Sequence, residues 1–373
     1  MIIILLSLMI ISLFIPFVLA KQRKTYLTDF ILENKTKNKG FSNSLESDDI
    51  SYEATAYGLE ILAYYELFET KGLFGNIKTN INITEFQSKL KDKLDDLIKC
   101  PICQETSSIL YNLYYNVRAL DLLNYTFSKA IVNDIKSFLD STEQAGGGFA
   151  PTNTSTSPSL ISTYFAIKIY PIIGKSIPNK ATHKQWIKDC KNSDGGYGGN
   201  TTLSSTLSNT YYAVLAVNIL GKLSDLSDRS KTVDYIESFY IDDESDLNNF
   251  GGYLPDKNAK YAQISSTYYS IRVISLLDES ELNNDTTTQW LLDRQNFKDG
   301  GFYELSDASE QKVSSVTSSY FAFQALKIFD DDLKVLNVKI WKVEFNWIIL
   351  IIVISAIAIA ITAFIVLWRK RRV

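Results

Sequence analysis

The sequence contains one histidine and three cysteines in 373 residues, so it is poor in the side chains that bind zinc. Cys100 and Cys103 form the only close pair, and a structural zinc site would need a second pair of ligands. The pair is also compatible with a local disulfide, which would leave Cys190 unpaired. We therefore expect neither a metal nor a cofactor.

Clusters of basic side chains are missing everywhere except in the last few residues. The chain carries 38 Lys and Arg against 42 Asp and Glu, which is a formal net charge of −4. Proteins that bind nucleic acids gather Lys and Arg on one surface to neutralise phosphates. The charge distribution therefore excludes a nucleic-acid partner.

Charged residues are absent from one long stretch, residues 347–368. At ~1.5 Å of rise per residue, a helix of this length crosses a bilayer core of about 30 Å. Trp347 and Trp368 stand at the ends, where headgroups favour aromatic rings, and four basic residues follow at 369–372. We predict a juxtamembrane linker at 336–346, a transmembrane helix at 347–368 and a cytoplasmic tail at 369–373, so the lipid bilayer is an expected partner.

Residues 1–20 form a second apolar run, typical of a signal peptide cleaved near Ala20. No basic residue precedes this run, whereas Lys21, Arg23 and Lys24 follow it, so a retained signal anchor is the alternative. In either case the predicted orientation of the C-terminal helix places residues 21–345 outside the cytoplasm. Six Asn-x-Ser/Thr sequons suit an exported domain.

A repeat of about fifty residues is present along the chain. Four segments each open with two glycines and an aromatic residue, and reach a helix start rich in aromatic residues 14 to 18 residues later. The openings are Gly147-Gly148-Phe149, Gly195-Gly196-Tyr197, Gly251-Gly252-Tyr253 and Gly300-Gly301-Phe302. Two weaker copies stand upstream. The six helix starts are anchored on Tyr57, Tyr114, Tyr164, Tyr211, Tyr268 and Tyr320. Such a period indicates a repeat architecture.

Each repeat is predicted to form two helices. The first is amphipathic, as in residues 286–297, and the Gly-Gly pair is expected to stop it. The second is apolar on nearly all sides, as in residues 211–220 and 268–277, so it must be buried. A Ser or Thr at its start is expected to cap it. We predict an all-α fold in which residues 21–335 form six α/α hairpins in a closed toroid, with an open superhelix as the alternative.

The segment Gln-Asn-Phe-Lys-Asp-Gly-Gly-Phe at residues 295–302 resembles the repeat signature of the prenyltransferase and squalene-cyclase superfamily. The Ser-Thr-Tyr-x-Ala helix starts are similar to that family too. The resemblance covers roughly residues 25–330. It implies an α/α toroid with a central cavity, a fold shared by protein prenyltransferase β subunits, terpene cyclases and thioester domains, so the fold alone does not identify a function.

The catalytic motifs that this resemblance implies are not present. Protein prenyltransferases hold zinc with Asp-x-Cys at one inner-helix start and His at the next, and the matching positions here include Ser208 and Thr210. The single histidine, His183, falls on an external helix and is interpreted as an ordinary surface residue. Squalene-type cyclases use Asp-x-Asp-Asp, whereas the only aspartate cluster, residues 330–332, follows the last helix and is interpreted as solvated. The Cys-Gly-Glu-Gln of thioester domains is absent as well.

Carboxylates and aromatic rings supply the remaining candidates. Glu53, Glu304 and Asp307 are candidate acids by analogy with α/α glycosidases, although exposed cap or loop positions are expected for them. The candidates for lining a ligand cavity are Tyr114, Tyr164, Tyr211, Tyr268, Tyr320 and Glu53. Packing between neighbouring helices is the competing explanation for the rings.

Three functions follow from this pattern. The leading hypothesis is a non-catalytic binding or scaffold module, displayed outside the cytoplasm, for a hydrophobic ligand, a glycan or a protein partner. The second is an enzyme that acts on isoprenoid or lipid-linked substrates. The third is an accessory subunit of a membrane complex, similar in layout to the luminal toroid of ribophorin II in oligosaccharyltransferase.

Overall fold

The computed structural model describes residues 17–37, 39–71, 77–99, 109–306 and 309–344, and a few positions between 355 and 368. Within it the chain forms two compact units. The larger is Tyr26–Leu333, and the smaller combines Met1–Thr25 with Lys334–Val373.

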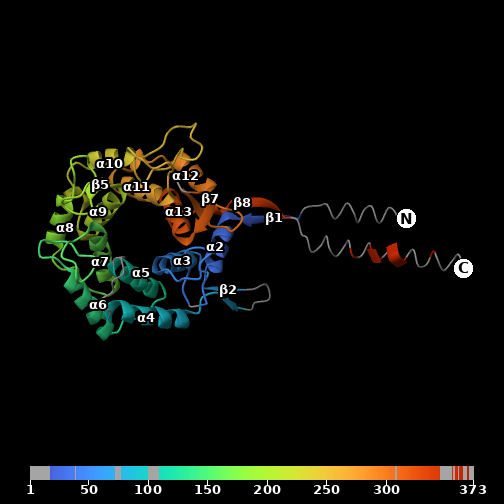
Figure 1. Ribbon diagram of the computed structural model, residues 1–373, viewed down its shortest axis with the longest axis horizontal. Coiled ribbons are helices and arrows are strands. Elements are labelled where there is room, and N and C mark those ends of the chain that lie inside the picture. Colours follow the sequence, from blue (N-terminus) through green and yellow to red (C-terminus); the bar gives the residue numbers. More distant parts are fainter. Residues whose placement is uncertain are drawn as a thin grey trace. The chain divides into compact units, whose positions relative to one another are not determined.

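The larger unit is a ring of helix pairs (Figure 1). The inner helices are α3 (Tyr52–Tyr64), α5 (Ile109–Leu122), α7 (Leu160–Ile172), α9 (Leu207–Leu220), α11 (Ile264–Leu277) and α13 (Val316–Phe329). The outer helices are α2 (Arg23–Glu33), α4 (Ile83–Lys99), α6 (Lys129–Thr142), α8 (Lys180–Asp189), α10 (Arg229–Glu237) and α12 (Asn284–Asp293). This confirms the α/α toroid predicted from the repeat.

The two rings differ in burial as their sequences predict. The amphipathic outer helix α4 buries one stripe, made of Phe86, Leu90, Leu94 and Leu97. The inner helix α9 instead buries residues around its whole circumference, from Leu207 to Leu220. A helix that is apolar on all sides buries most of its apolar surface when it lies between two neighbouring inner helices and an outer helix. The hydrophobic core of the unit therefore lies in and around the inner ring.

The ring closes between its last and first repeats. The inner helix α13 packs against α3, and Gln324 donates a hydrogen bond to Glu60 across that contact, at 3.0 Å. The backbone N–H of Val316 donates to the carbonyl of Asn43 at 2.8 Å, and that of Thr317 donates to the Asn43 side chain at 3.0 Å. These bonds cap the start of α13 with a residue from the first repeat. The closed arrangement is therefore correct, and the open superhelix is wrong.

The Gly-Gly pairs lock each repeat to the next outer helix. The first glycine of each pair has a positive φ and touches a backbone carbonyl of that helix, so that an added Cβ would lie 2.2 to 2.8 Å from the carbonyl oxygen. The four contacts are Gly147 with Thr182, Gly195 with Lys231, Gly251 with Thr286, and Gly300 with Tyr26. The second glycine packs against an aromatic ring one turn further on. The preceding outer helix ends several residues before the pair, so close approach rather than helix termination demands the glycines.

The predicted Ser/Thr caps are present at the starts of α3, α7, α9 and α13. The residue that caps α7 is Ser159, whose hydroxyl accepts the N–H of Ser162 at 3.1 Å. The Thr163 hydroxyl instead accepts the backbone N–H of Phe149, the aromatic residue after Gly-Gly, at 2.9 Å. The same bond recurs in four other repeats, at Thr55, Thr210, Thr267 and Ser319. The recurring hydroxyl therefore holds the loop before it against its own inner helix.

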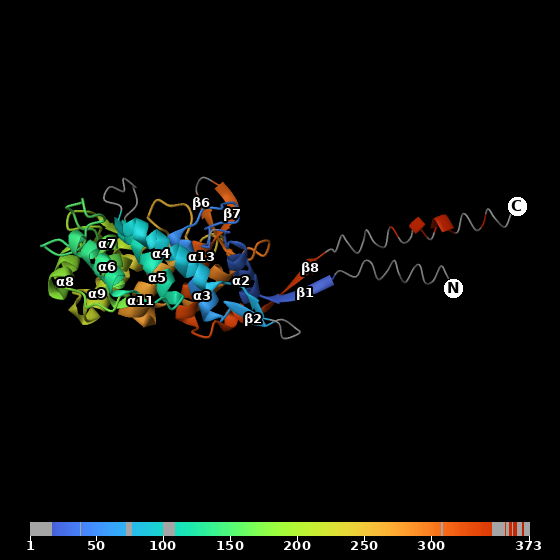
Figure 2. The same cartoon turned by 90° about the horizontal axis from the view of Figure 1, so that it is seen from below.

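Four short antiparallel ladders add to the all-α prediction. Three of them connect helices within the larger unit: β2 (Glu69–Lys71) with β3 (Ile77–Thr79), β4 (Tyr197–Gly198) with β5 (Ser205–Thr206), and β6 (Phe302–Ser306) with β7 (Ser309–Ser315). The β6–β7 ladder projects from one face of the ring (Figure 2). The sequence does not indicate these ladders, because their strands show no regular alternation of apolar and polar residues.

The smaller unit contains the fourth ladder. Strand β1 (Phe17–Gln22) pairs with β8 (Lys339–Glu344), so that Phe17 faces Glu344 and Gln22 faces Lys339. The predicted signal cleavage point, after Ala20, falls inside β1, and the predicted linker at 336–346 contains β8. Most of the predicted transmembrane helix, 347–368, lies outside the described residues, and among those that are described no helix is long and apolar enough to cross a bilayer.

Substituting Gly300 tests the lock that closes the ring. In Gly300→Ala the new Cβ would lie 2.2 Å from the Tyr26 carbonyl oxygen, and the positive φ adds strain. Gly174→Ala is the matched control, because Gly174 also has a positive φ but has open space around it. Thermal and urea unfolding should show a loss of about 1–2 kcal/mol for the control, from backbone strain alone. Gly300→Ala should lose at least about 2 kcal/mol more, and equal losses would contradict the lock.

Candidate functional site

Six aromatic rings, one from each inner helix, form a closed circle at the centre of the toroid. They are Tyr57, Tyr115, Phe165, Tyr212, Tyr269 and Phe321. Successive ring centroids are 5.2 to 6.0 Å apart, and Phe321 returns to Tyr57 at 5.5 Å. Aromatic pairs at such spacings contribute about 0.5–1.5 kcal/mol each beyond their burial. The circle therefore joins all six repeats through side-chain contacts.

The predicted cavity residues form a second set beside this circle. Tyr114, Tyr164, Tyr211, Tyr268 and Tyr320 each immediately precede a member of the circle in the sequence. The sequence analysis matched Tyr57 with Tyr114 and the other members of this second set, which is wrong by one residue. In the structure Tyr57 is a member of the circle, and Ala56 occupies the position that corresponds to Tyr114. The Tyr320 ring stacks on Tyr57, with 3.7 Å between the ring centroids.

These tyrosines do face a common cavity, but it is small. The two sets of rings, with Lys168, Leu215 and Arg272, line a space of about 170 Å³. Pockets that enclose a drug-sized ligand hold roughly 300–1,000 Å³. The rings thus fill most of the axis by packing against one another. Their contact with a ligand remains a prediction.

Glu53 lies at the aromatic circle, in the first turn of α3. Its side chain is half-buried, which differs from the exposed cap position expected for it. Burial raises the pKa of the Glu53 carboxyl, and hydrogen bonding from Tyr111 and Tyr57 offsets part of that rise. A carboxyl group with a raised pKa retains its proton to higher pH, which makes Glu53 the best placed acid near the axis.

Glu304 has a structural role. Its carboxylate accepts the backbone N–H groups of Ile264 at 2.9 Å and Ser265 at 3.4 Å, at the start of α11. The residue that precedes α11, Gln263, makes no side-chain cap. Glu304 therefore caps the helix of the preceding repeat, where a negative charge also favours the helix dipole. The prediction of an exposed loop carboxylate is wrong for Glu304, and Asp307 lies outside the described residues.

The positions that match zinc ligands in prenyltransferases hold structural hydroxyls. Thr210 accepts the N–H of Tyr197 at 3.0 Å and donates to the carbonyl of Thr206 at 2.8 Å. Both hydrogen-bonding functions of this hydroxyl are thus engaged within its own repeat. Cys100 and Cys103 lie outside the described residues. Asp331 and Asp332, beyond the end of α13, are exposed, as predicted for a solvated run.

His183 is fully buried, so its interpretation as a surface residue is wrong. It lies on the inward side of α8, where Nδ1 accepts the backbone N–H of Gly148 at 3.0 Å. Nε2 is 3.2 Å from a carboxylate oxygen of Glu143, and the imidazole packs on the Phe149 ring. Burial lowers the pKa of His183, although Glu143 opposes this shift. The residue supports the Gly-Gly loop of the preceding repeat and does not face the axis.

A group of charged residues at the axis was missed by the sequence argument. Arg118, Lys168 and Arg272 each stand four residues after a tyrosine of the second set, so they lie on the same face of their helices, one turn further on. The helical spacing was visible in the sequence, but nothing in the sequence showed that these faces converge. Ion-pair partners exist for Arg118, which lies 3.5 Å from Glu60 and 2.8 Å from Asp121.

Comparison with known proteins agrees with this architecture. The family described as "Prenyltransferase alpha-alpha toroid domain" matches residues 83–184, 175–302 and 247–343. No curated protein matches the chain.

Several solved structures share the fold. Protein geranylgeranyltransferase-I from Candida albicans, complexed with GGPP, aligns with a TM-score of 0.56 at 14% identity, over 84% of this chain and 95% of that one. The type II terpene cyclase MstE from Scytonema aligns with a TM-score of 0.54 at 11% identity, over 84% of this chain and 97% of that one. At these identities the likeness extends to the fold alone.

The pKa of His183 gives a direct test of the structure around the Gly-Gly loop. The chain has one histidine, so its imidazole resonances in NMR are unambiguous. We expect a pKa below the ordinary value of about 6.5, because burial favours the neutral ring. A lowered pKa means that stability is complete above the unfolded value and is lost as pH falls through the folded one. A pKa at or above 6.5 would contradict this packing, and His183→Gln should remove this part of the acid sensitivity.

Proposed function

The chain belongs to the prenyltransferase alpha-alpha toroid domain family, and we propose that within it this protein is a non-catalytic binding or scaffold module. The observation that carries the proposal is the closed circle of rings across the axis. Among the rings, where an enzyme of this fold would need room for a hydrophobic substrate, this chain has about 170 Å³. A cavity of that size is below the range that encloses a drug-sized molecule. The adjoining pocket of about 380 Å³ between α11 and α13 is lined mainly by polar and charged side chains, which do not suit a hydrophobic substrate.

The residues at the helix starts support the same proposal. Thr210, Thr267 and Ser319 stand where metal ligands would be needed, and each hydroxyl accepts a backbone N–H from its own Gly-Gly loop. Hydroxyl groups are also poor zinc ligands beside thiolate and imidazole. The elements that build the ring are thus retained, while the positions that would carry metal chemistry serve to fasten it.

A second candidate function rests on Glu53. Its carboxyl group has a raised pKa and lies against the aromatic circle, which is an arrangement that could protonate an alkene and stabilise the resulting cation on ring faces. The neighbouring structures include a protein geranylgeranyltransferase and a type II terpene cyclase. An acid-initiated cyclase is therefore the enzyme class that this site would best suit.

A turnover assay separates the two candidates. The full-length protein, in detergent or nanodiscs, is incubated with prenyl diphosphates of 10 to 20 carbons, with and without a thiol peptide and zinc. We expect no product above that of the heat-treated protein. Product formation that is lost in Glu53→Gln, but kept in Glu304→Gln, would replace the scaffold proposal with the cyclase.

The scaffold proposal also predicts that the rings act through stability. Tyr211→Ala should lower the free energy of unfolding by about 3–5 kcal/mol, because it leaves a hole among packed rings. Tyr211→Phe keeps the ring and should cost about 1 kcal/mol, the net value of a hydrogen bond. Urea denaturation followed by circular dichroism measures both. Similar small losses for the two variants would show that the ring is not packed as described.

We further propose that the module is anchored outside the cytoplasm by two apolar segments. The ladder of the smaller unit supports this, because Phe17 pairs with Glu344. The first residue of β1 and the last residue of β8 therefore lie at the same end of the ladder. One apolar run directly precedes β1 in the sequence, and the other, at 347–368, follows β8. Cleavage after Ala20 would remove four of the six residues of β1, so retention of the first run preserves the pairing.

Analysis of the mature protein tests this anchoring. Intact-mass measurement and N-terminal sequencing of the membrane fraction should find residues 1–20 present, and alkaline carbonate should leave the protein in the membrane. Protease added to sealed cells or vesicles of the native orientation should digest the toroid but spare the basic tail. A mature N-terminus at Lys21 would exclude the two-segment anchor, and extraction by carbonate would exclude membrane insertion altogether.

A further inference from the structure

Two cations at the centre of the toroid have no acidic partner among the described residues. Lys168 and Arg272 both line the axial cavity and are half-buried. Their neighbour Arg118 is neutralised by Glu60 and Asp121, whereas no carboxylate lies within ion-pair distance of Lys168 or Arg272 in the described part of the chain. Fully buried charges are normally paired, and Lys168 and Arg272 are partly removed from water without such a pair. These two positive charges are thus available to an external group.

The cations also act on one another. Burial lowers the pKa of Lys168 most, and the positive charge of Arg118 lowers it further. The carboxylate of Glu60 opposes this shift, and Arg272 makes the smallest lowering contribution. The ammonium group of Lys168 lies over the rings of Tyr114 and Tyr164, with 5.8 and 5.9 Å to their centroids. Ring faces stabilise a cation but do not neutralise it. A negative group bound here would relieve the repulsion.

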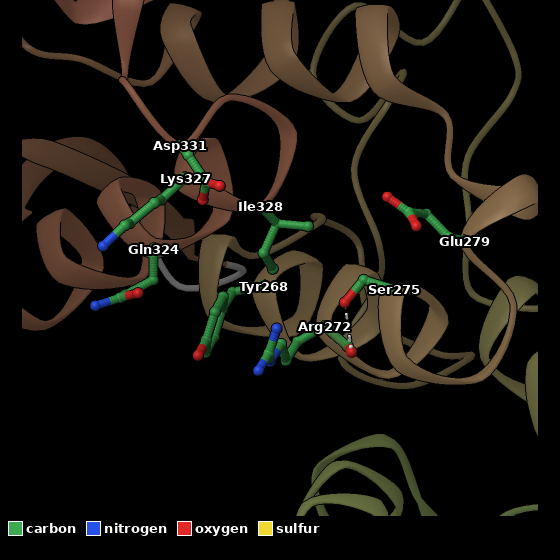
Figure 3. Close-up of a pocket in the computed structure, with 8 residues that line it drawn as sticks. All are labelled: Tyr268, Arg272, Ser275, Glu279, Gln324, Lys327, Ile328 and Asp331. Carbon is green, nitrogen blue, oxygen red and sulfur yellow. Dashed lines mark hydrogen bonds between the residues drawn. The ribbon is translucent and has the colours of Figure 1, made fainter. Parts of the chain in front are cut away.

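A larger pocket adjoins the axial cavity and shares Arg272 and Tyr268 with it. This pocket holds about 380 Å³ between α11 and α13. Figure 3 shows the polar ends of Tyr268, Arg272 and Gln324 directed to the same side, while the carboxylates of Glu279 and Asp331 lie apart from Arg272. A ligand in this pocket would reach Arg272 from one side, and its charged end would then face Lys168 across the cavity.

The tyrosines around the cations are hydrogen-bond donors. Burial raises the pKa of Tyr164 and Tyr268, so their hydroxyls stay protonated at neutral pH. Neutral phenols can donate to an anion without adding charge. The set of groups at this point is therefore a guanidinium fork, an ammonium and several O–H donors.

We propose that Lys168 and Arg272 bind the phosphate group of a phosphorylated ligand at the axis of the toroid. Arg118, Lys168 and Arg272 carry three positive charges against the two carboxylates of Glu60 and Asp121, so the cluster has an excess of one positive charge. A phosphate monoester, which carries about −1.5 to −2 at neutral pH, can approach the two cations that make no ion pair. Arginine binds two phosphate oxygens at once, and lysine adds a point charge. The site lies on the C-terminal side of the aromatic circle, whereas the zinc and acid motifs sought above belong to the helix starts. The inference rests on the proposed binding function, and names the chemistry that it binds.

Phosphate titration of the full-length protein in phosphatidylcholine nanodiscs tests this site. Inorganic phosphate should raise the unfolding temperature in a saturable way, and potassium chloride at equal ionic strength should not. Lys168→Gln and Arg272→Gln should each weaken phosphate affinity about tenfold, the value of losing one charge-assisted hydrogen bond. Arg229→Gln, at an exposed position on α10, is the control and should leave the affinity unchanged.

A phosphate effect no larger than that of chloride, or one that persists in both variants, would overturn the proposal. If Lys168→Gln fails to fold, Arg272→Lys is the second variant, because it keeps the positive charge and removes the two-pronged guanidinium group. A loss of phosphate affinity in Arg272→Lys still identifies the site.

Two further competition experiments identify the kind of molecule that supplies the phosphate group. Glycerol phosphate in solution represents a soluble phosphate ester, and nanodiscs containing phosphatidylglycerol represent a lipid headgroup. Competition by the lipid assigns the site to a headgroup, whereas competition by the soluble ester alone assigns it to a free ligand, and either supports the site. Turnover of a prenyl substrate would remove the scaffold function but not phosphate binding, so the two proposals fail separately.

Discussion

The close approach of each Gly-Gly loop to the next outer helix is the constraint on which the toroid depends. Where Gly300 meets the Tyr26 carbonyl, no side chain fits between the two backbones, and Phe30 packs over Gly301 one turn later. The same contact between Gly195 and Lys231 sets the spacing of an interior pair of repeats. Because one geometry is used at interior joints and at the closing joint, the chain returns to its first repeat. A solenoid with looser joints would leave its end repeats exposed.

Closure has a direct consequence for the axis. Six helices held at this spacing bring one aromatic ring each to the centre, where Tyr57 and Tyr115 share a hydrogen bond of 2.6 Å. Rings of that size nearly fill the space that the helices enclose, so the toroid is a packed ring with a small cavity. The charged residues one turn further on are then confined to the remaining space. Packing of the rings and accumulation of positive charge are thus two results of the same geometry.

The sequence was informative wherever a property repeats along the chain. The Gly-Gly period and the apolar surface of helices such as 211–220 predicted six pairs and which helix of each pair is inside, because burial follows from apolar periodicity alone. It failed for single residues that depend on a neighbouring repeat. Glu304 caps a helix from another repeat, and His183 supports the Gly148 loop across a repeat boundary. No local pattern identifies such partners.

The distinction is between properties that a residue has within its own helix and those created by contact between helices. The order of polar and apolar residues by itself determined the number of repeats and the inner and outer rings, and it predicts a membrane segment at 347–368. Only the tertiary structure decided that the ring closes, that Tyr57 belongs to the aromatic circle, and that Lys168 and Arg272 face the same cavity. The physical reason is that these groups are far apart in the chain: Lys168 and Arg272 are separated by 104 positions, and Tyr57 and Tyr320 by 263. Their distance in space is set by packing through the intervening repeats.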